Sequence, residues 1–210
     1  MNQTSRAIRA VIFDYGGVLM RTESHVSREQ LGKRFGLTVL ELSRLVFESE
    51  ESQLVQLGRM APDERWERIG RQLGLQTREE ALAVRREMFA GDELDQQLVA
   101  YIRDLRRRVK TALLSNATVR LVSTLRDELH IEDCFDTVVI SAQVGLMKPD
   151  PAIYRLVLDR LDVTPQHAVF IDDMPENVSA AVALGMHGIR FTTLQALLQE
   201  LEPLLQVPEA

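Results

Sequence analysis

The stretch "AVIFDYGGVL" (residues 10–19) decides the fold. Four apolar residues lead to a single carboxylate, Asp14, which is followed after one residue by a glycine pair. A short continuous apolar run bounded by turn residues is typical of a strand that is buried on both faces of a parallel sheet. Asp14 then has two interpretations: a turn residue, as aspartate before glycine often is, or a carboxylate that the strand delivers into a phosphate-handling site.

Composition limits the classes of protein to consider. The chain has 210 residues, 45% hydrophobic and 27% charged, which is enough for one core with a small inserted domain. Its net charge of −6 without a basic block argues against a nucleic-acid partner. The single cysteine, Cys134, predicts a reduced, buried thiol. Because no apolar run resembles a signal peptide or a bilayer span, we expect a cytoplasmic protein without a membrane partner.

Four further apolar runs are expected to be parallel strands, and helical patterns separate them. Asp150 and Pro151 suit the N-cap and first turn of one of these helices, and Gly185 suits the end of another. Strands that alternate with helices at this spacing predict an α/β fold with a doubly wound parallel sheet. The predicted strands cover residues 111–115, 137–141, 167–171 and 188–191.

Residues 24–91 break this rhythm because they contain only helical patterns. We expect about four helices there, forming a small bundle inserted after the first strand. The predicted domains are therefore a core of residues 1–22 and 92–210 and a helical cap of residues 23–91. A last helix, within residues 93–108, is expected before the second strand.

Polar side chains gather where the predicted strands end. Ligand sites of open α/β sheets lie at the carboxyl ends of the strands, so these groups are expected to converge in space. They are Asp14, Ser115, Asn116, Lys148, Asp172 and Asp173.

The carboxylates permit two kinds of chemistry. Asp14 could attack phosphorus as a nucleophile and form an aspartyl-phosphate. Asp172 and Asp173 are adjacent acids, and buried like charges are costly without a cation. Mg²⁺ is typically held by one or two carboxylates together with phosphate and water. The alternative for this pair is helix capping, since Pro175 suggests a helix start just beyond.

The remaining groups suit a phosphate. Ser115 and Asn116 are expected at a helix N-terminus, where a hydroxyl and free N–H groups bind anions, although simple capping would also explain them. Lys148 would supply a point charge to the phosphate and to Asp14. The alternative is a solvated loop lysine, but only three lysines occur in the chain.

Four segments resemble, in order and spacing, the motifs of the haloacid dehalogenase (HAD) superfamily: "FDYGGVL", "LLSNA", "GLMKPDPAIY" and "FIDDMPEN". The insertion resembles the helical cap of subfamily I, and "QLGRMAPDERWERIGRQLGL" (56–75) is similar to cap segments there. The third and fourth motifs look most like the phosphatase branch that includes the N-terminal domain of soluble epoxide hydrolase and bacterial glucose-1-phosphate phosphatase.

This resemblance implies a Mg²⁺-dependent phosphatase that hydrolyses a small phosphorylated metabolite. The protein would be a monomer or a homodimer, and the cap would close over the substrate. Asp14 would be both nucleophile and metal ligand. The other implied ligands are the Gly16 carbonyl, Asp173 and, through water, Asp172. The phosphate would be held by Ser115, Asn116 and Lys148. Asn177 would take a supporting role near the site.

Gly16 departs from the motif, because typical phosphatases of the superfamily carry there an aspartate that acts as acid and base. One explanation is a substrate with a good leaving group, such as a sugar-1-phosphate or an acyl phosphate. Another is a substitute side chain, His25 or Glu23; the alternative for each is an exposed hinge residue. A third is a different reaction, as in phosphonoacetaldehyde hydrolases with a cap lysine, for which Lys33 is available, or in dehalogenases. The last is a weakly active ligand-binding protein.

Overall fold

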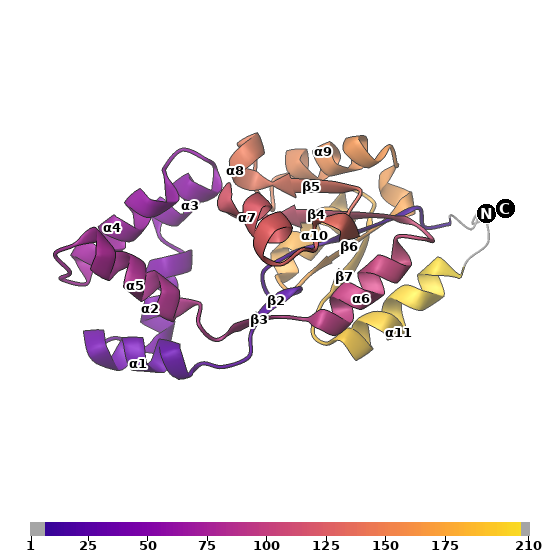
Figure 1. Ribbon diagram of the computed structural model, residues 1–210. Helices are drawn as coiled ribbons and strands as arrows, with labels where there is room; N and C mark the ends of the chain where they lie inside the picture. Colours follow the sequence, from indigo (N-terminus) through magenta and orange to yellow (C-terminus); the bar gives the residue numbers. More distant parts are fainter. Residues whose placement is uncertain (1–6, 207–210) are drawn as a thin grey trace.

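A computed structural model describes residues 7–206. Its centre is a sheet of five parallel strands in the order β5-β4-β1-β6-β7 (Figure 1). The predicted α/β fold is therefore confirmed, and each predicted strand lies within one residue of an observed one. The strands are β1 (Ala10–Phe13), β4 (Lys110–Ser115), β5 (Thr137–Ile140), β6 (Ala168–Asp172) and β7 (His187–Arg190).

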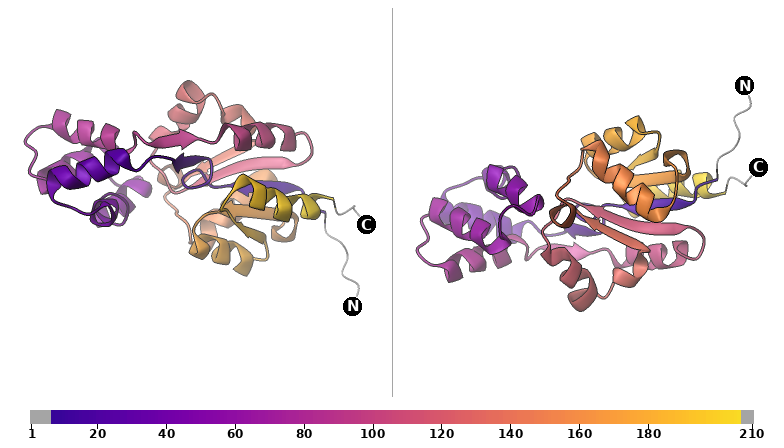
Figure 2. Two further views of the ribbon diagram at one scale, coloured as in Figure 1. Left: turned by 90° about the horizontal axis from the view of Figure 1, so that it is seen from below. Right: turned by 90° about the horizontal axis from the view of Figure 1, so that it is seen from above.

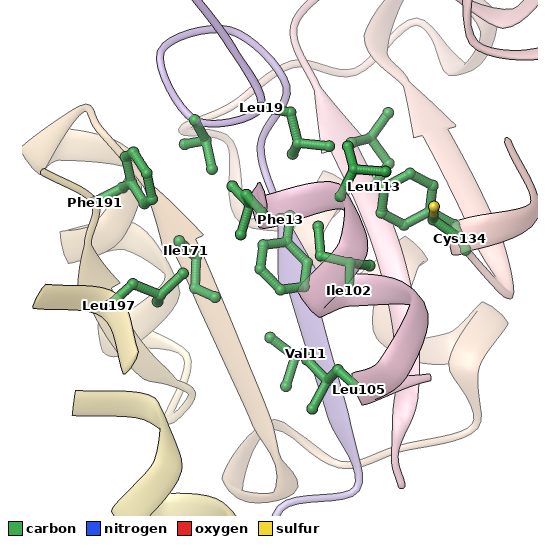
Figure 3. Close-up of a cluster of buried hydrophobic side chains, with 14 of the residues drawn as sticks. Val11, Phe13, Leu19, Ile102, Leu105, Leu113, Cys134, Ile171, Phe191 and Leu197 are labelled. Carbon is green, nitrogen blue, oxygen red and sulfur yellow. The ribbon is translucent and has the colours of Figure 1, made fainter. Parts of the chain in front are cut away.

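Helices cover both faces of this sheet. Successive side chains of β1 point to opposite faces and so pack into two different clusters. Val11 and Phe13 pack with helices α6 (Gln96–Leu105) and α11 (Leu194–Leu205) in one cluster. Figure 3 shows Phe13 between side chains of α6 and of the neighbouring strands. Cys134 is buried in the same cluster, as the sequence predicts.

The opposite face is covered by α9 (Pro151–Leu161) and α10 (Pro175–Ala183). Ala10 and Ile12 point into this second cluster and are fully buried. Because helices cover both faces, a ligand can approach the sheet at the ends of its strands.

Five helices form a bundle beside the sheet (Figures 1 and 2) with an apolar cluster of its own around Trp66. The expectation of about four helices is wrong, because the pattern over residues 38–55 divides at Ser49. Ser49 is extended, and its side chain accepts from Ser52 N at 3.2 Å, which caps a new helix. The helices are α1 (Val26–Phe35), α2 (Val39–Phe47), α3 (Glu50–Gln56), α4 (Pro62–Gln72) and α5 (Arg78–Met88).

Two short strands connect the bundle to the sheet. β2 (Met20–Thr22) and β3 (Asp92–Leu94) pair antiparallel, and neither was expected from the sequence. The helix expected within residues 93–108 is shorter, because Asp95 caps α6 by accepting from Leu98 N at 2.9 Å. Three-residue strands are too short to show an alternating pattern.

The segment after β4 also differs from expectation. A helix was expected directly after Asn116, but α7 (Arg120–Ser123) begins later and continues as a π-helical turn, Thr124–Glu128. Ala117 N instead donates to the Ser141 hydroxyl at 3.0 Å, which ties this segment to α8 (Ser141–Val144). Short 3₁₀ turns at Glu132–Cys134 and Pro165–His167 complete the chain.

Across residues 7–206, none of the helices combines the length and apolar character that crossing a membrane requires.

Gly91 provides a test of the connection between bundle and sheet. Gly91 O accepts from Glu23 N at 2.9 Å. A Cβ at this glycine would lie 1.9 Å from the backbone oxygen of Ser24. We expect Gly91→Ala to lower the free energy of unfolding by about 1–3 kcal/mol, because the two connections must separate. Denaturant unfolding measures this.

The matched control is Gly16→Ala, because no atom lies within 4 Å of a Cβ built there. It should change the free energy of unfolding by less than about 0.5 kcal/mol. Equal stability of the two variants would contradict the close packing at Gly91.

Candidate active site

Strand pairing brings two carboxylates together. Phe13 of β1 pairs with Ile171 of β6, so the next residues in register are Asp14 and Asp172. The backbone N–H of Asp14 continues the pairing by donating to Ile171 O at 2.9 Å. Both aspartates are buried, with 7% and 0% of their surfaces exposed. The parallel register alone therefore places two acids side by side at the carboxyl edge of the sheet.

Lys148 lies between these two acids. Its Nζ is 2.7 Å from Asp14 Oδ1 and 2.7 Å from Asp172 Oδ2. The contact with Asp172 is a hydrogen bond, whereas the contact with Asp14 is an ion pair without hydrogen-bond alignment. Lys148 is 2% exposed, so the alternative of a solvated loop lysine is wrong. A buried ion pair is favourable only when close geometry offsets desolvation, and both contacts here are short.

The electrostatics of the site leave it short of positive charge. Burial raises the pKa of Asp14 to about 6, Lys148 opposes this, and the charge of Asp172 adds to it. Burial also raises the pKa of Asp173, again with a contribution from Asp172. Together, three carboxylates and one ammonium leave two negative charges uncompensated.

Asp172 is held by several donors at once. Oδ1 accepts from Met174 N at 2.8 Å, but Met174 is itself the N-cap of α10 and this helix has no side-chain cap, so the capping interpretation of Asp172 is wrong. The Asn177 amide donates to both carboxylate oxygens at 3.1 Å, while Lys148 takes Oδ2. The Tyr154 hydroxyl in turn donates to Asn177 O at 2.9 Å. Both carboxylate oxygens of Asp172 thus already accept hydrogen bonds, and one of these bonds orients Lys148.

Asn116 fixes the backbone of Lys148, a role that the sequence did not suggest. Its side-chain amide donates to Lys148 O at 2.8 Å, and its side-chain oxygen accepts from Lys148 N at 2.8 Å. Ser115 ends β4 and is 3% exposed. The expectation that Ser115 and Asn116 stand at a helix N-terminus is wrong, because α7 begins at Arg120.

Asp173 completes an acidic cluster. Oxygen atoms of Asp14, Asp172 and Asp173 all lie within 4.8 Å of one another, close enough to share one cation. Asp173 packs so tightly against Gly17 that a Cβ there would lie 2.4 Å from its carboxylate carbon. Gly17 also has φ of +77°, a conformation that favours glycine. The glycine pair predicts a turn but does not identify Asp173 as the side chain that occupies the space beside Gly17.

Three other candidates lie outside this cluster. His25 is exposed at the N-cap of α1. Glu23 is exposed and pairs with Arg21 at 3.1 Å. Lys33 is exposed in the last turn of α1. Over residues 7–206, no hydrogen bond or ion pair joins any of the three to Asp14, Lys148 or the paired aspartates.

Comparison with known proteins agrees with this geometry. Residues 8–185 match the haloacid dehalogenase-like hydrolase family, and the chain belongs to that family. It is therefore an enzyme of the hydrolase class. The sesquiterpene phosphatase astK of Aspergillus oryzae is 32% identical over 203 residues, covering 94% of this chain and 96% of the relative.

Two further matches extend the comparison. The bifunctional epoxide hydrolase 2 of Rattus norvegicus is 42% identical over 78 residues, which cover 36% of this chain and 14% of the relative. This bears out the predicted resemblance to soluble epoxide hydrolase. A mutant HAD-family enzyme of Bacteroides thetaiotaomicron, in complex with magnesium and inorganic phosphate, has a TM-score of 0.72 at 20% identity. It covers 89% of this chain and 95% of its own, and it shows a shared fold.

Replacing Lys148 tests the electrostatic arrangement. We expect Lys148→Met to lower the free energy of unfolding by about 3–5 kcal/mol, because Asp14 and Asp172 would remain buried without a counter-charge. Adding Asp172→Asn should recover part of this loss. Denaturant unfolding without divalent cations measures all variants.

Lys33→Met is the matched control, since Lys33 is exposed. It should change stability by less than about 0.5 kcal/mol. If Lys148→Met were equally mild, the ammonium would not be what makes the acid pair tolerable.

Proposed function

We propose that this enzyme is a Mg²⁺-dependent phosphatase that hydrolyses a small organic phosphate through an aspartyl-phosphate at Asp14. The observation that carries the proposal is the buried Asp14, in contact with Lys148 at 2.7 Å and within 4.8 Å of two further carboxylates. The names of relatives support it, including the phosphatase from Aspergillus that matches along almost the whole chain.

A divalent cation suits the residues present. The three clustered carboxylates exceed the single ammonium by two charges, and hard oxygen ligands are those that Mg²⁺ prefers. Asp14, Asp173 and the Gly16 carbonyl would hold the ion. Asp172 would contribute through water, since its oxygens already accept from Lys148, Asn177 and a backbone N–H. Magnesium supplies charge neutralisation and orientation to a bound phosphate.

The remaining steps belong to the side chains. A carboxylate oxygen of Asp14 attacks phosphorus, and the bond between phosphorus and the leaving oxygen breaks. Water then attacks the phosphorus of the aspartyl-phosphate, which releases inorganic phosphate and restores the carboxylate. Lys148, Ser115 and the backbone N–H of Asn116 bind the phosphoryl oxygens. The Asn116 and Asn177 side chains position the lysine and its partner acid.

Gly16 limits which leaving groups the enzyme can displace. The loop lacks the usual acid and base, a contribution of about 10²–10⁴-fold in other enzymes. His25 and Glu23 are exposed, and within residues 7–206 no hydrogen bond or ion pair joins them to the acidic cluster. The structure therefore gives no support to either residue as a substitute acid and base. We therefore favour substrates whose leaving group needs little protonation. The helices of residues 23–91 would serve as the cap over the site.

Other reactions have less support. A Schiff-base lysine needs activation by desolvation or a neighbouring cation, but Lys33 is exposed. A dehalogenase would not need the paired aspartates that surround Asp14. A binding protein with weak activity is distinguished by a panel of phosphorylated metabolites with and without EDTA: binding without magnesium-dependent turnover would support it.

The nucleophile is tested by Asp14→Asn. With acetyl phosphate as substrate and magnesium present, we expect kcat to fall by about 10³-fold or more, since an amide cannot form the acyl phosphate. The matched control is Asp104→Asn, an exposed aspartate on α6, which should retain full activity. Retained activity in purified, folded Asp14→Asn protein would rule out this mechanism.

The missing acid is tested by a series of phosphate esters with leaving groups of increasing pKa. We expect kcat/KM to fall steeply along the series. Gly16→Asp should raise activity on a simple alkyl phosphate by about tenfold or more, because the position is open enough for the side chain. Gly16→Asn has the same size without the proton and should give no gain. A flat dependence on leaving-group pKa would show that another acid acts.

A further inference from the structure

A cavity lies between the bundle and the sheet, apart from the acidic cluster. Its volume is about 410 Å³, within the range of roughly 300–1,000 Å³ that small-molecule sites occupy. The apolar part of its lining consists of Val55, Met60, Ala61, Pro62 and Val119. Gly58 and two exposed charged residues, Arg59 and Glu64, complete it.

Both parts of the molecule build this cavity. Val119 comes from the segment after β4, and the other lining residues come from the end of α3, the start of α4 and the loop between them. Two contacts hold these walls together. Gly58 sits so close to α8 that a Cβ would lie 2.3 Å from Ala142 O. Asp63 of α4 pairs with Arg120 of α7 at 2.7 Å.

The cavity lies close to the phosphate-binding groups along the chain. Val119 follows Ser115 by four residues, so their Cα atoms are at most about 14 Å apart. The intervening segment is fixed at Asn116, which bonds to the Lys148 backbone, and at Ala117, which bonds to the Ser141 hydroxyl. The Val119 side of the cavity is therefore no farther from Ser115 than the length of an extended organic chain on a phosphate.

We propose that this cavity binds the organic group of the substrate and that this group is apolar. This inference rests on the proposed phosphatase function. Val119 is a large apolar side chain that is 48% exposed, and a substrate would cover it. The hydroxyl groups of a sugar would meet a mostly apolar wall, and polar groups lose free energy when they are buried without partners. The cavity therefore favours phosphates whose organic group is apolar over sugar phosphates.

Binding of alkylphosphonates tests this directly, because they cannot be hydrolysed. Calorimetric titration of the wild-type enzyme with magnesium, from methylphosphonate to octylphosphonate, should show affinity rising about three- to fourfold for each added methylene until the cavity is full. Val119→Asp should lower the ratio of octyl to methyl affinity by about tenfold or more.

Val182→Asp is the matched control, because Val182 is 51% exposed on α10 and lies outside the cavity lining. It should leave the ratio unchanged. Equal affinities for octyl- and methylphosphonate would overturn the inference, as would equal effects of the two variants.

Turnover of acetyl phosphate separates this inference from the proposed function. If acetyl phosphate is hydrolysed but chain length has no effect, the phosphatase stands and the apolar site is overturned. If affinity rises with chain length and falls in Val119→Asp without any turnover, the apolar site stands and the phosphatase is overturned.

Discussion

The contact of Lys148 with Asp14 and Asp172 is the constraint on which the rest of the site depends. Parallel pairing of β1 with β6 leaves no choice about the two acids, because residues in register at the strand ends must be neighbours. Two carboxylates in a poorly solvated position are tolerable only with a cation between them. Lys148 provides it, with both contacts at 2.7 Å.

Several other residues serve to keep this contact in place. Asn116 holds the lysine backbone through two reciprocal hydrogen bonds, and Asn177 holds the partner acid. Gly17 leaves room for the third carboxylate, Asp173. Rigid support of this kind stabilises a charged cluster that would otherwise relax. It also keeps Asp14 Oδ1 in contact with the lysine ammonium.

The helical bundle is held near the acidic cluster by the two chain segments that join it to the sheet. Gly91 and the β2–β3 pair bring both crossings of the chain to one place, beside the loop that carries Gly16. A second attachment, through Gly58 and the Asp63–Arg120 pair, closes the opposite side. The bundle therefore rests on the sheet edge at two points, and the space between them is where a substrate would be chosen.

Much of this arrangement could be predicted from the sequence, for reasons visible in particular residues. Continuous apolar runs such as "AVIF" identify buried strands. Ligand sites of open α/β sheets lie at the carboxyl ends of the strands, so Asp14, Lys148 and Asp172 could be expected to converge. The division of the bundle pattern at Ser49 could not, because a serine inside an amphipathic pattern is compatible with both a helix interior and a cap. Short β2 and β3 carry no periodic signal.

The role of the Asn116 side chain was also beyond prediction. Its partner is the backbone of Lys148, and backbone positions leave no trace in residue identity. The contact between Gly17 and Asp173 is similar, since a glycine pair indicates a turn without saying which side chain needs the space.

The central claim is that Asp14 carries the phosphoryl group during turnover. The direct measurement is acid quenching of the magnesium-loaded enzyme while it hydrolyses acetyl phosphate, followed by mass spectrometry of its peptides. The account predicts one added phosphoryl group on the peptide that contains Asp14. Continued phosphate release with that peptide unmodified at every quench time would contradict it.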